Sequence, residues 1–392
     1  MQFELTEEQI SVKEAARDFT NQELLPGVIE RDRDMIHPTE QVRKMGEMGF
    51  LGMMVSPVYG GGGMDTLSYV LAMEEISKVD SSSSVIMSVN NSLVCWGIEE
   101  YGSEEQKAKY LPRLTSGEWI GSFCLSEPEA GSDATHQRTT AIDMGDHYLL
   151  NGTKNWITNG GKSSMHIVIA QTNQELGHRG INAFIVEKSW DGVVIGAKED
   201  KLGIRASDTH TIMYTDVKVP KENRIGPDGF GFKFAMKVLT GGRIGIAAQA
   251  LGIASGAYEL AVKYAKEREA FGKPIAQHQA VAFKLADMAT EIEAARLLVY
   301  RAAWMKDQGM DYTSAAAMAK LFASEVAMKH TVEAVQVHGG YGYVKEYHVE
   351  RLMRDAKITQ IYEGTSEMQR IVISRNVLSG QLYEPMWQTE NA

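Results

Sequence analysis

A single glutamate near the end of the chain stands where a general base could work. Glu363 lies between Tyr362 and Gly364, immediately before a predicted final helix. An acid at a helix entry is favoured by the helix dipole even when it has no other role. The flanking Ile361, Tyr362 and glycine instead indicate a tight, partly apolar setting, in which the pKa of a carboxyl group rises and the group can act as a general base. The residue pattern alone leaves both interpretations open.

Four segments concentrate glycine and polar residues in otherwise apolar surroundings. They are Phe123–Asp133 (FCLSEPEAGSD), Asn155–Gly161 (NWITNGG), Gln336–Tyr343 (QVHGGYGY) and Gln360–Arg370 (QIYEGTSEMQR). The first has the composition of a surface loop, but its hydroxyls, its amides and Gly131 also suit close approach of an anionic or heteroaromatic ligand. Trp156, beside Thr158 and paired glycines, is harder to explain by packing alone, although tryptophan is more often a core residue.

Several common ligand-binding motifs do not occur. There is no G-x-G-x-x-G, which argues against a Rossmann dinucleotide site. Gly160-Gly161-Lys162-Ser163 resembles the end of a P-loop, but that motif requires glycine at the position of Trp156. The sequence also has no H-E-x-x-H and no G-x-S-x-G, and its histidines show no metal-ligand spacing, so we predict no metal site.

The composition excludes several classes of protein. The chain has 392 residues, with 51 acidic and 40 basic side chains and a net charge of −11. That charge argues against a nucleic-acid partner, and no apolar run reaches the roughly 18–20 residues of a membrane span. Cys95 and Cys124 cannot build a disulfide framework, which favours a reducing compartment. No targeting segment is visible, so we expect a bacterial-type cytoplasmic protein, although a processed form from the mitochondrial matrix has the same features.

Hydrophobic periodicity divides the chain into helical, β and helical parts, which predicts the α+β fold class with segregated elements. Thr6-Glu7-Glu8-Gln9 forms a predicted capping box, and helical patterns follow at residues 38–48, 64–79 and 88–101. Strands are expected at residues 165–170, 181–186 and 210–217, as parts of a small barrel or sandwich. His147–Leu150 followed by Asn151-Gly152 predicts a hairpin turn. We place the domains at residues 1–119, 120–229 and 230–392.

The last part of the chain predicts an antiparallel helical bundle. One helix face is formed by Val281, Leu285, Met288, Ile292, Ala295 and Val299, whose spacing alternates between four and three residues. A second long helix is expected over residues 313–338. Ser366-Glu367-Met368-Gln369 reads as a capping box that opens a final helix through about Leu378.

Five motifs together resemble the acyl-CoA dehydrogenase family. They are FCLSEPEAGSDA, NWITNGG, KEREAFGKPI, QVHGGYGY and RDAKITQIYEGTSEMQR, in the family's order and spacing, and the resemblance runs from Leu5 to Leu378. It implies an N-terminal helical domain, a central β-barrel and a C-terminal four-helix bundle. It also implies FAD, held between barrel and bundle without a Rossmann motif.

The resemblance assigns roles residue by residue. Glu363 matches the catalytic base, and Ser132, Thr240, Arg243 and Gly364 match substrate-binding positions. FAD-binding positions match Phe123, Leu125, Ser126, Gly131, Ser132, Trp156, Ile157, Thr158, Arg268, Phe271, Gln279, Gln336, Gly339, Gly340, Thr365, Ser366 and Glu367. Arg268, Gln279 and the 336–340 turn are expected to reach FAD across a subunit interface in a homotetramer, a dimer of dimers.

The implied reaction explains these residue types. The α-proton of an acyl thioester is only weakly acidic, so hydrogen-bond donors to the thioester oxygen must stabilise the developing enolate. Glu363 removes that proton while the β-hydrogen leaves as hydride to flavin N5, which gives the trans-2-enoyl-CoA. Electron-transfer flavoprotein is the implied electron acceptor.

Two departures from the family pattern bear on the sub-branch. Some branches carry the base immediately before the arginine that Arg243 matches, but Gly242 stands there, so Glu363 has no competitor. Relatives commonly have aspartate at Thr240, which puts that CoA contact in doubt. Ser84 stands where the glutaryl-specific branch has arginine, so no dicarboxylyl substrate is expected, and residues 88–93 resemble the short-chain (butyryl) branch most.

Other interpretations make different predictions. Branched short-chain and medium-chain acyl-CoA remain alternative substrates. An acyl-CoA oxidase would use the same site but pass electrons to oxygen, and such chains are usually longer. A catalytically silent flavin or CoA scaffold would lack the base, whereas Glu363 is intact. A helical interaction protein without cofactor would be colourless.

Overall fold

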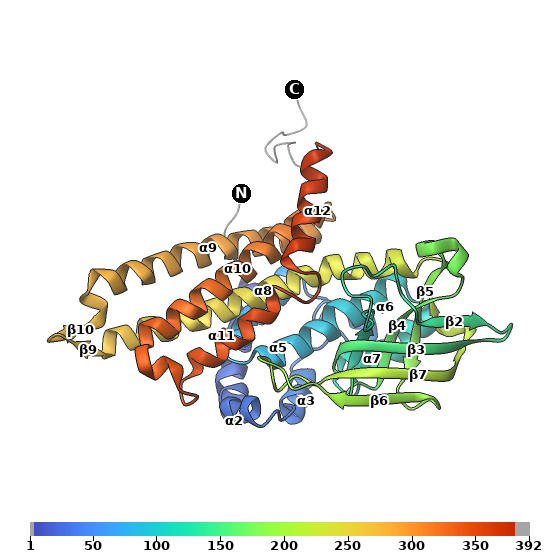
Figure 1. The fold of residues 1–392 in the computed structure, drawn as a ribbon, viewed down its shortest axis with the longest axis horizontal. Coiled ribbons are helices and arrows are strands. Elements are labelled where there is room, and N and C mark those ends of the chain that lie inside the picture. Colours follow the sequence, from blue (N-terminus) through green and yellow to red (C-terminus); the bar gives the residue numbers. More distant parts are fainter. Residues whose placement is uncertain (1–3, 381–392) are drawn as a thin grey trace.

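The computed structural model describes residues 4–380 and divides into a helical part, a β part and a second helical part (Figure 1). The first helices are α1 Glu7–Phe19, α2 Val28–Arg33, α3 Thr39–Glu47, α4 Thr66–Ser77, α5 Ser81–Ser88, α6 Trp96–Tyr101 and α7 Glu104–Thr115. The expected capping box at Thr6 is present: its hydroxyl accepts from the amide of Gln9, whose side chain bonds back to the amide of Thr6.

Two π-helical segments interrupt this helical part, η1 at Thr20–Leu24 and η3 at Val89–Cys95. The helix expected over residues 88–101 is therefore present as a continuous run of α5, η3 and α6. Such π-helical turns are rare and frequently occur at functional sites. Shorter 3₁₀ turns lie at η2 Pro57–Tyr59, η4 Gln174–Gly180, η5 Lys221–Asn223, η6 Ile275–Gln277 and η7 Gly339–Tyr343.

An eight-stranded sheet makes up the central part. Its strands are β1 Gly121–Cys124, β2 Thr140–Asp143, β3 His147–Thr158, β4 Met165–Gln171, β5 Ile181–Glu187, β6 Val193–Lys198, β7 Thr209–Pro220 and β8 Arg224–Ile225. The pairing order is β6-β7-β3-β2-β4-β5-β8, with β1 also paired to β4. The pairs of β4 with β1 and β2 are parallel, and the others are antiparallel.

The hairpin turn predicted at Asn151-Gly152 is wrong, because β3 runs straight through it. Gly152 lies in an irregularity of the β3–β7 register, between Leu150 and Gly152. The Asn151 side chain bridges this irregularity. Its amide nitrogen donates to the Asp216 carboxylate, and its oxygen accepts from the Asp216 backbone amide. The turn that links β2 to β3 lies earlier, where the Met144 amide donates to the His147 carbonyl. Pairing on both edges of β3 overrides the local Asn-Gly signal.

Long helices form the last part: α8 Gly231–Glu267, α9 Gln279–Asp307, α10 Thr313–His338, α11 His348–Thr359 and α12 Ser366–Leu378. A two-stranded hairpin, β9 Glu269–Ala270 with β10 Lys273–Pro274, links α8 to α9. The apolar face predicted on α9 is confirmed, since Met288, Ile292, Ala295 and Val299 are buried. The cap of α12 lies one residue earlier than predicted: the hydroxyl of Thr365 accepts from the Met368 amide, while Ser366 donates to Glu325.

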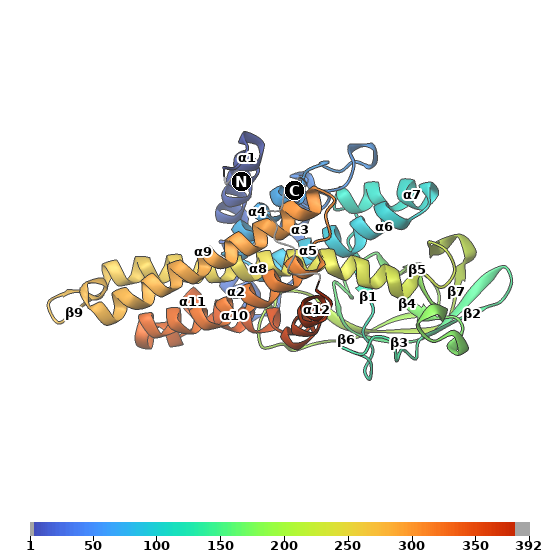
Figure 2. The same ribbon diagram turned by 90° about the horizontal axis from the view of Figure 1, so that it is seen from above.

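Helix α8 joins the two halves of the molecule. It packs against α4, α9, α10 and α11 at the bundle and against β5 at the sheet, and the ribbon shows it running between the two ends (Figures 1 and 2). By length and composition α8 could cross a membrane, but 83% of its most apolar window is buried within the protein. That burial is the ordinary state of a core helix.

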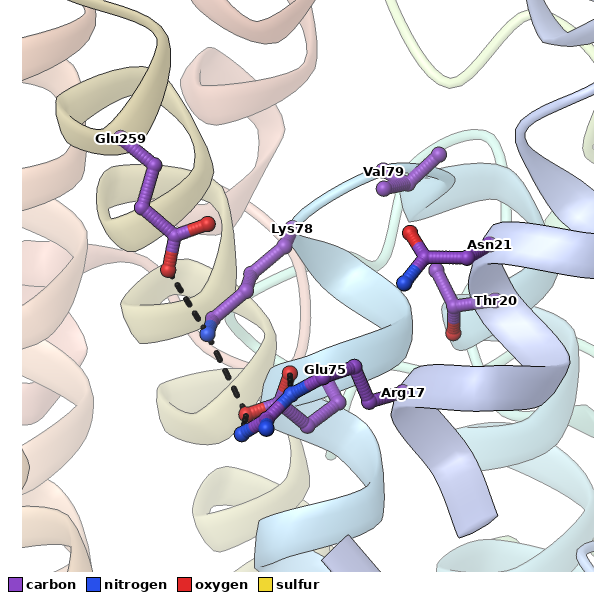
Figure 3. Close-up of a pocket in the computed structure, with 7 residues that line it drawn as sticks. All are labelled: Arg17, Thr20, Asn21, Glu75, Lys78, Val79 and Glu259. Carbon is purple, nitrogen blue, oxygen red and sulfur yellow. Dashed lines mark hydrogen bonds and ion pairs between the residues drawn. The ribbon is translucent and has the colours of Figure 1, made fainter. Parts of the chain in front are cut away.

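Ion pairs fasten α1 to α4 and α8 around a small polar pocket (Figure 3). The buried Glu75 accepts from Arg17 at 3.2 Å and from Lys78 at 3.2 Å, and Lys78 also pairs with Glu259 at 2.9 Å. Although burial acts to raise it, the hydrogen bond from Arg17 and the charge of Lys78 lower the pKa of Glu75. Glu75 therefore stays ionised and links the helices.

Candidate active site

Glu363 lies in the tight connection between α11 and α12. Its φ is 52° and that of Gly364 is 95°, so two consecutive residues are left-handed. A non-glycine residue in this region is strained and needs support from its surroundings. The carboxylate points inward: Oε2 of Glu363 is buried and has no hydrogen-bond partner within residues 4–380.

Two cations from neighbouring helices face this carboxylate. Lys320 comes from α10 and Arg243 from α8, and neither is within ion-pair distance of Glu363 in the described structure. Burial raises the pKa of Glu363 to about 7, and the two cations partly oppose that rise. A carboxyl group that titrates near neutral pH and has a free, buried oxygen has the properties of a general base.

Gly242 leaves space for the Glu363 carboxylate. A β-carbon added at Gly242 would overlap Oε2 of Glu363 and lie 2.7 Å from Cδ2 of Leu93. Leu93 belongs to the π-helix η3, so three elements meet at this point. The structure thus explains why glycine stands before Arg243: a side chain at 242 and the carboxylate of Glu363 compete for the same space.

A first group of predicted FAD residues lies beside this site, at the end of β1, in the loop after it and at the end of β3. Its members are Phe123, Leu125, Ser126, Trp156, Ile157 and Thr158. Phe123 and Leu125 belong to the apolar cluster that also contains Leu93 and packs against Tyr362. The loop that follows is tied to β3, because the Asn155 amide donates to the Ser126 carbonyl at 2.9 Å. The Thr158 carbonyl likewise accepts from the Ser122 hydroxyl at 2.9 Å.

Trp156 presents its indole outward from this group. Its φ is 61° and 61% of it is exposed, although tryptophan is usually well covered in a single domain. The strained backbone occurs in the irregular stretch of the β3–β7 register between Lys154 and Ile157. An exposed, backbone-fixed aromatic surface suits stacking against a planar ligand.

A buried ion pair between Lys154 and Glu127 holds the loop after β1 against β3. Lys154 is fully buried, and its ammonium donates to the Leu125 carbonyl at 2.9 Å and to Glu127 at 2.8 Å. Glu127 also accepts the amides of Arg138 and Thr139. The loop over residues 123–139 is therefore fastened at both ends to one lysine of β3. This pair was not predicted from the sequence.

The second group of predicted FAD residues lies at the far end of the helical bundle, away from Glu363. Its members are at the β9–β10 hairpin, the start of α9 and the end of α10, and they are all exposed: Arg268, Phe271, Gln279, Gln336, Gly339 and Gly340. Phe271 is 96% exposed. Both ribbon views place the hairpin at the end of the bundle farthest from the sheet (Figures 1 and 2). One chain does not bring the two groups together.

The other predicted residues lie in the loop after β1, in α8 and at the start of α12. Gly131 and Ser132 are exposed in the loop after β1. The hydroxyl of Thr240 donates to the Met236 carbonyl within α8, and Nε of Arg243 is buried without a partner among the described residues. Glu367 is exposed on the first turn of α12.

Sequence reasoning missed Lys320 and Gln249, which are both fully buried next to the base segment. Lys320 donates to the Gly364 carbonyl at 2.8 Å, and Gln249 accepts from the Tyr362 hydroxyl. A signal for Lys320 is present, since it stands on the alanine-rich face that Ala316, Ala323 and Ala327 define. A lone lysine on the apolar face of a core helix predicts a buried charge with a specific role.

Comparison with family models now decides the classification. Three models match in succession: the acyl-CoA dehydrogenase N-terminal domain at residues 6–118, the middle domain at 122–217 and the C-terminal domain at 229–378. This chain belongs to the acyl-CoA dehydrogenase family. The predicted family and its fold, with helical, β and helical parts, are confirmed.

Similar proteins cover almost the whole chain. A short-chain-specific acyl-CoA dehydrogenase of Clostridium acetobutylicum is 52% identical over 96% of this chain and 100% of its own length. The solved structure of butyryl-CoA dehydrogenase from Megasphaera elsdenii matches with a TM-score of 0.95 and 49% identity, over 96% of this chain and 100% of that one. A chain from a structure of the electron transferring flavoprotein of Acidaminococcus fermentans matches with a TM-score of 0.95 and 53% identity, over 96% and 100%.

Proposed function

We propose that this protein oxidises a short-chain acyl-CoA to the trans-2-enoyl-CoA, with Glu363 as base, FAD as cofactor and electron-transfer flavoprotein as electron acceptor. The observation that carries the proposal is the buried Oε2 of Glu363, which has no hydrogen-bond partner among the described residues and belongs to a carboxyl group whose pKa is raised to about 7. The names of the similar proteins support the acyl-CoA substrate and its short chain.

The residues of the two groups suit FAD. The first offers the exposed indole of Trp156 and the Thr158 hydroxyl beside the loop after β1, next to the base. The second offers the Arg268 guanidinium, Gln279, Gln336 and two glycines with open space around them, which suit a diphosphate and a nucleotide. Bound FAD would supply the hydride acceptor.

The residues at and around Glu363 then have separate roles in the reaction. The Glu363 carboxylate takes the α-proton onto Oε2, and its apolar surroundings keep the pKa of the group high enough to do so. Arg243 and Lys320 favour the ionised base before it accepts the proton. The apolar cluster around Leu93, Phe123 and Tyr362 excludes water from the reacting carbons.

Because the two groups lie far apart in one chain, we propose that two subunits share each FAD. The first group of one protomer would face the second group of its partner, within a homotetramer built as a dimer of dimers. Isologous contacts of this kind create two equivalent sites per dimer. The wide exposure of Phe271 and Trp156 in the single chain supports the arrangement.

A buried polar side chain next to the Glu363 segment, that of Gln249, supports a short acyl chain. Gln249 is fully buried, donates to the Ser81 carbonyl at 2.9 Å and to the Ser84 hydroxyl at 3.0 Å, and accepts from the Tyr362 hydroxyl. Its hydrogen bonds fix it in place, so a longer apolar chain would have to displace a satisfied polar group. Rates on butyryl-, hexanoyl-, octanoyl- and branched acyl-CoA test this proposal, and a maximum at octanoyl-CoA or longer contradicts it.

The central experiment compares the wild type with Glu363→Gln. The wild type should be yellow and should bleach when butyryl-CoA is added without oxygen. Glu363→Gln should stay yellow and folded, with turnover lowered by at least about 10²-fold, because the general base is lost. Near-normal turnover would refute the assignment. Reduction of added electron-transfer flavoprotein identifies the acceptor, whereas rapid peroxide release would indicate an oxidase.

A further inference from the structure

Lys320 is a fully buried lysine whose ammonium reaches the segment that carries Glu363. It lies on α10, and its Nζ donates to the Gly364 carbonyl at 2.8 Å. The same carbonyl accepts from Nε2 of the buried Gln369, also at 2.8 Å, from α12. Two helices therefore hold one carbonyl, that of Gly364, the residue that directly follows the left-handed Glu363.

The charge of Lys320 is not matched by a close partner. No carboxylate within residues 4–380 forms an ion pair with it; the charged groups that face it are Glu363, Arg243 of α8, Glu325 of α10 and Glu367 of α12. Burial lowers the pKa of Lys320 to about 8, and Glu363 opposes that shift most. The group thus remains mostly protonated at neutral pH.

A structural role alone does not account for a lysine here. The Gly364 carbonyl already has a neutral donor in Gln369, and burying an ammonium costs much more free energy than burying an amide. That cost is offset only where the charge interacts with a developing or existing negative charge. Among the carboxylates, Glu363 has the largest electrostatic effect on the pKa of Lys320. Among the cations, Lys320 has the largest effect on the pKa of Glu363.

We propose that Lys320 is a positioning residue for the base: its ammonium fixes the Gly364 carbonyl, and with it the left-handed Glu363, and its charge favours the carboxylate form. This inference rests on the proposed role of Glu363. The charged groups that face Glu363 are Lys320 and Arg243, and the hydroxyls of Tyr69 and Tyr362 are close enough to sense it. Of these four groups, Lys320 alone faces the carboxylate and also bonds the backbone of the next residue, Gly364.

The test uses a matched pair of variants, Lys320→Met and Gln369→Met, in the FAD-loaded enzyme. Each removes one hydrogen bond to the same carbonyl and installs the same side chain, but only the first removes a positive charge. Both should lower the maximal rate of flavin reduction by butyryl-CoA, by about 10-fold, because the base is less well held. Only Lys320→Met should shift the acid limb of the pH–rate profile upward, by at least about half a pH unit.

A second readout follows the protonation of Glu363 without turnover. The carboxyl stretch of protonated Glu363, assigned by its loss in Glu363→Gln, is titrated by infrared spectroscopy in each variant. The midpoint should rise in Lys320→Met and stay near the wild-type value in Gln369→Met. Equal midpoints in the two variants, or equal displacements, would overturn the proposal.

Two further results keep the test decisive. Lys320→Arg retains the charge and should return the infrared midpoint to the wild-type value, and it replaces Lys320→Met as the informative variant if the methionine does not fold. If it leaves the midpoint displaced, the electrostatic role is refuted. If the infrared midpoint moves in Lys320→Met but the acid limb does not follow, Glu363 is not the base, and the proposed function fails instead.

Discussion

At the scale of single residues, the raised pKa of Glu363 lowers the stability of the folded state at neutral pH. Glu363 has an ordinary pKa of 4.5 that burial raises to about 7 in the folded protein. Between these two values the unfolded chain releases a proton that the folded chain keeps. The folded state therefore loses stability as pH rises through this window, by a total of about 3 kcal/mol.

We predict that Glu363→Gln removes this loss. Relative to the wild type, the variant should gain stability as pH rises from about 4.5 to about 7, and the gain should then level off. Denaturant unfolding at a series of pH values measures it, and Glu363→Asp, which keeps the titrating group, is the control. A difference between variant and wild type that does not change with pH would show that Glu363 titrates normally.

The second prediction at this scale concerns the space at Gly242. Gly242→Ala puts a methyl group against Oε2 of Glu363 and against Leu93, so the carboxylate must move. We expect turnover to fall by about 10²-fold, because a displacement of about 1 Å is costly at a reacting centre. FAD content should be unchanged.

The adjacent glycine is the matched control for this prediction. A β-carbon at Gly241 meets nothing closer than 3.8 Å, so Gly241→Ala should fold and turn over normally and gain up to about 1 kcal/mol in helix stability. Equal loss of turnover in the two variants would attribute the effect to α8 as a whole rather than to the base.

At the scale of elements, the loop after β1 depends on one buried lysine of β3. Lys154→Met leaves Glu127 as a buried carboxylate without its cation and leaves the Leu125 carbonyl without this donor. Breaking a buried pair from one side typically costs about 3–5 kcal/mol. We expect a loss of this size in the free energy of unfolding, with weaker retention of FAD, measured by denaturation and by flavin content.

Two comparisons qualify that prediction. Lys162→Met changes an exposed lysine of the next turn and should alter stability by less than about 0.5 kcal/mol. The double variant Lys154→Met, Glu127→Gln should recover part of the loss, because it removes the unpaired charge. Full additivity of the two single changes would contradict a coupled pair.

The same elements show how far the sequence could predict the fold. The long helices α9 and α10 were predictable because apolar spacing reports directly on one packed face. The continuation of β3 through Asn151-Gly152 was not predictable. Pairing with β2 and β7 decides the path of the strand, and no local pattern reports that pairing. Glu363 was recognisable from its motif, but the cation that faces it from α10 lies 43 positions away in the chain, at Lys320.

At the scale of the whole molecule, the first group of predicted FAD residues lies beside Glu363 and the sheet, whereas the second lies at the end of the bundle farthest from the sheet (Figures 1 and 2). Motifs in the sequence identify both groups but say nothing about the distance between them. That separation is what turns a list of cofactor residues into a prediction about assembly. If two subunits complete each site, defects in the two groups must complement each other.

We predict complementation between Trp156→Ala, from the first group, and Arg268→Ala, from the second. Each variant alone should have low activity, since all its sites are defective. In a mixed dimer one site carries both defects and the other carries neither. Random association makes half of the dimers mixed, so co-expression should restore about one quarter of wild-type activity. Activity of the unfractionated mixture checks this value, and doubly tagged, purified mixed dimers should reach about one half, because one of their two sites is intact. If both groups served one chain's FAD, hybrids would show no recovery, because every protomer would keep its own defect.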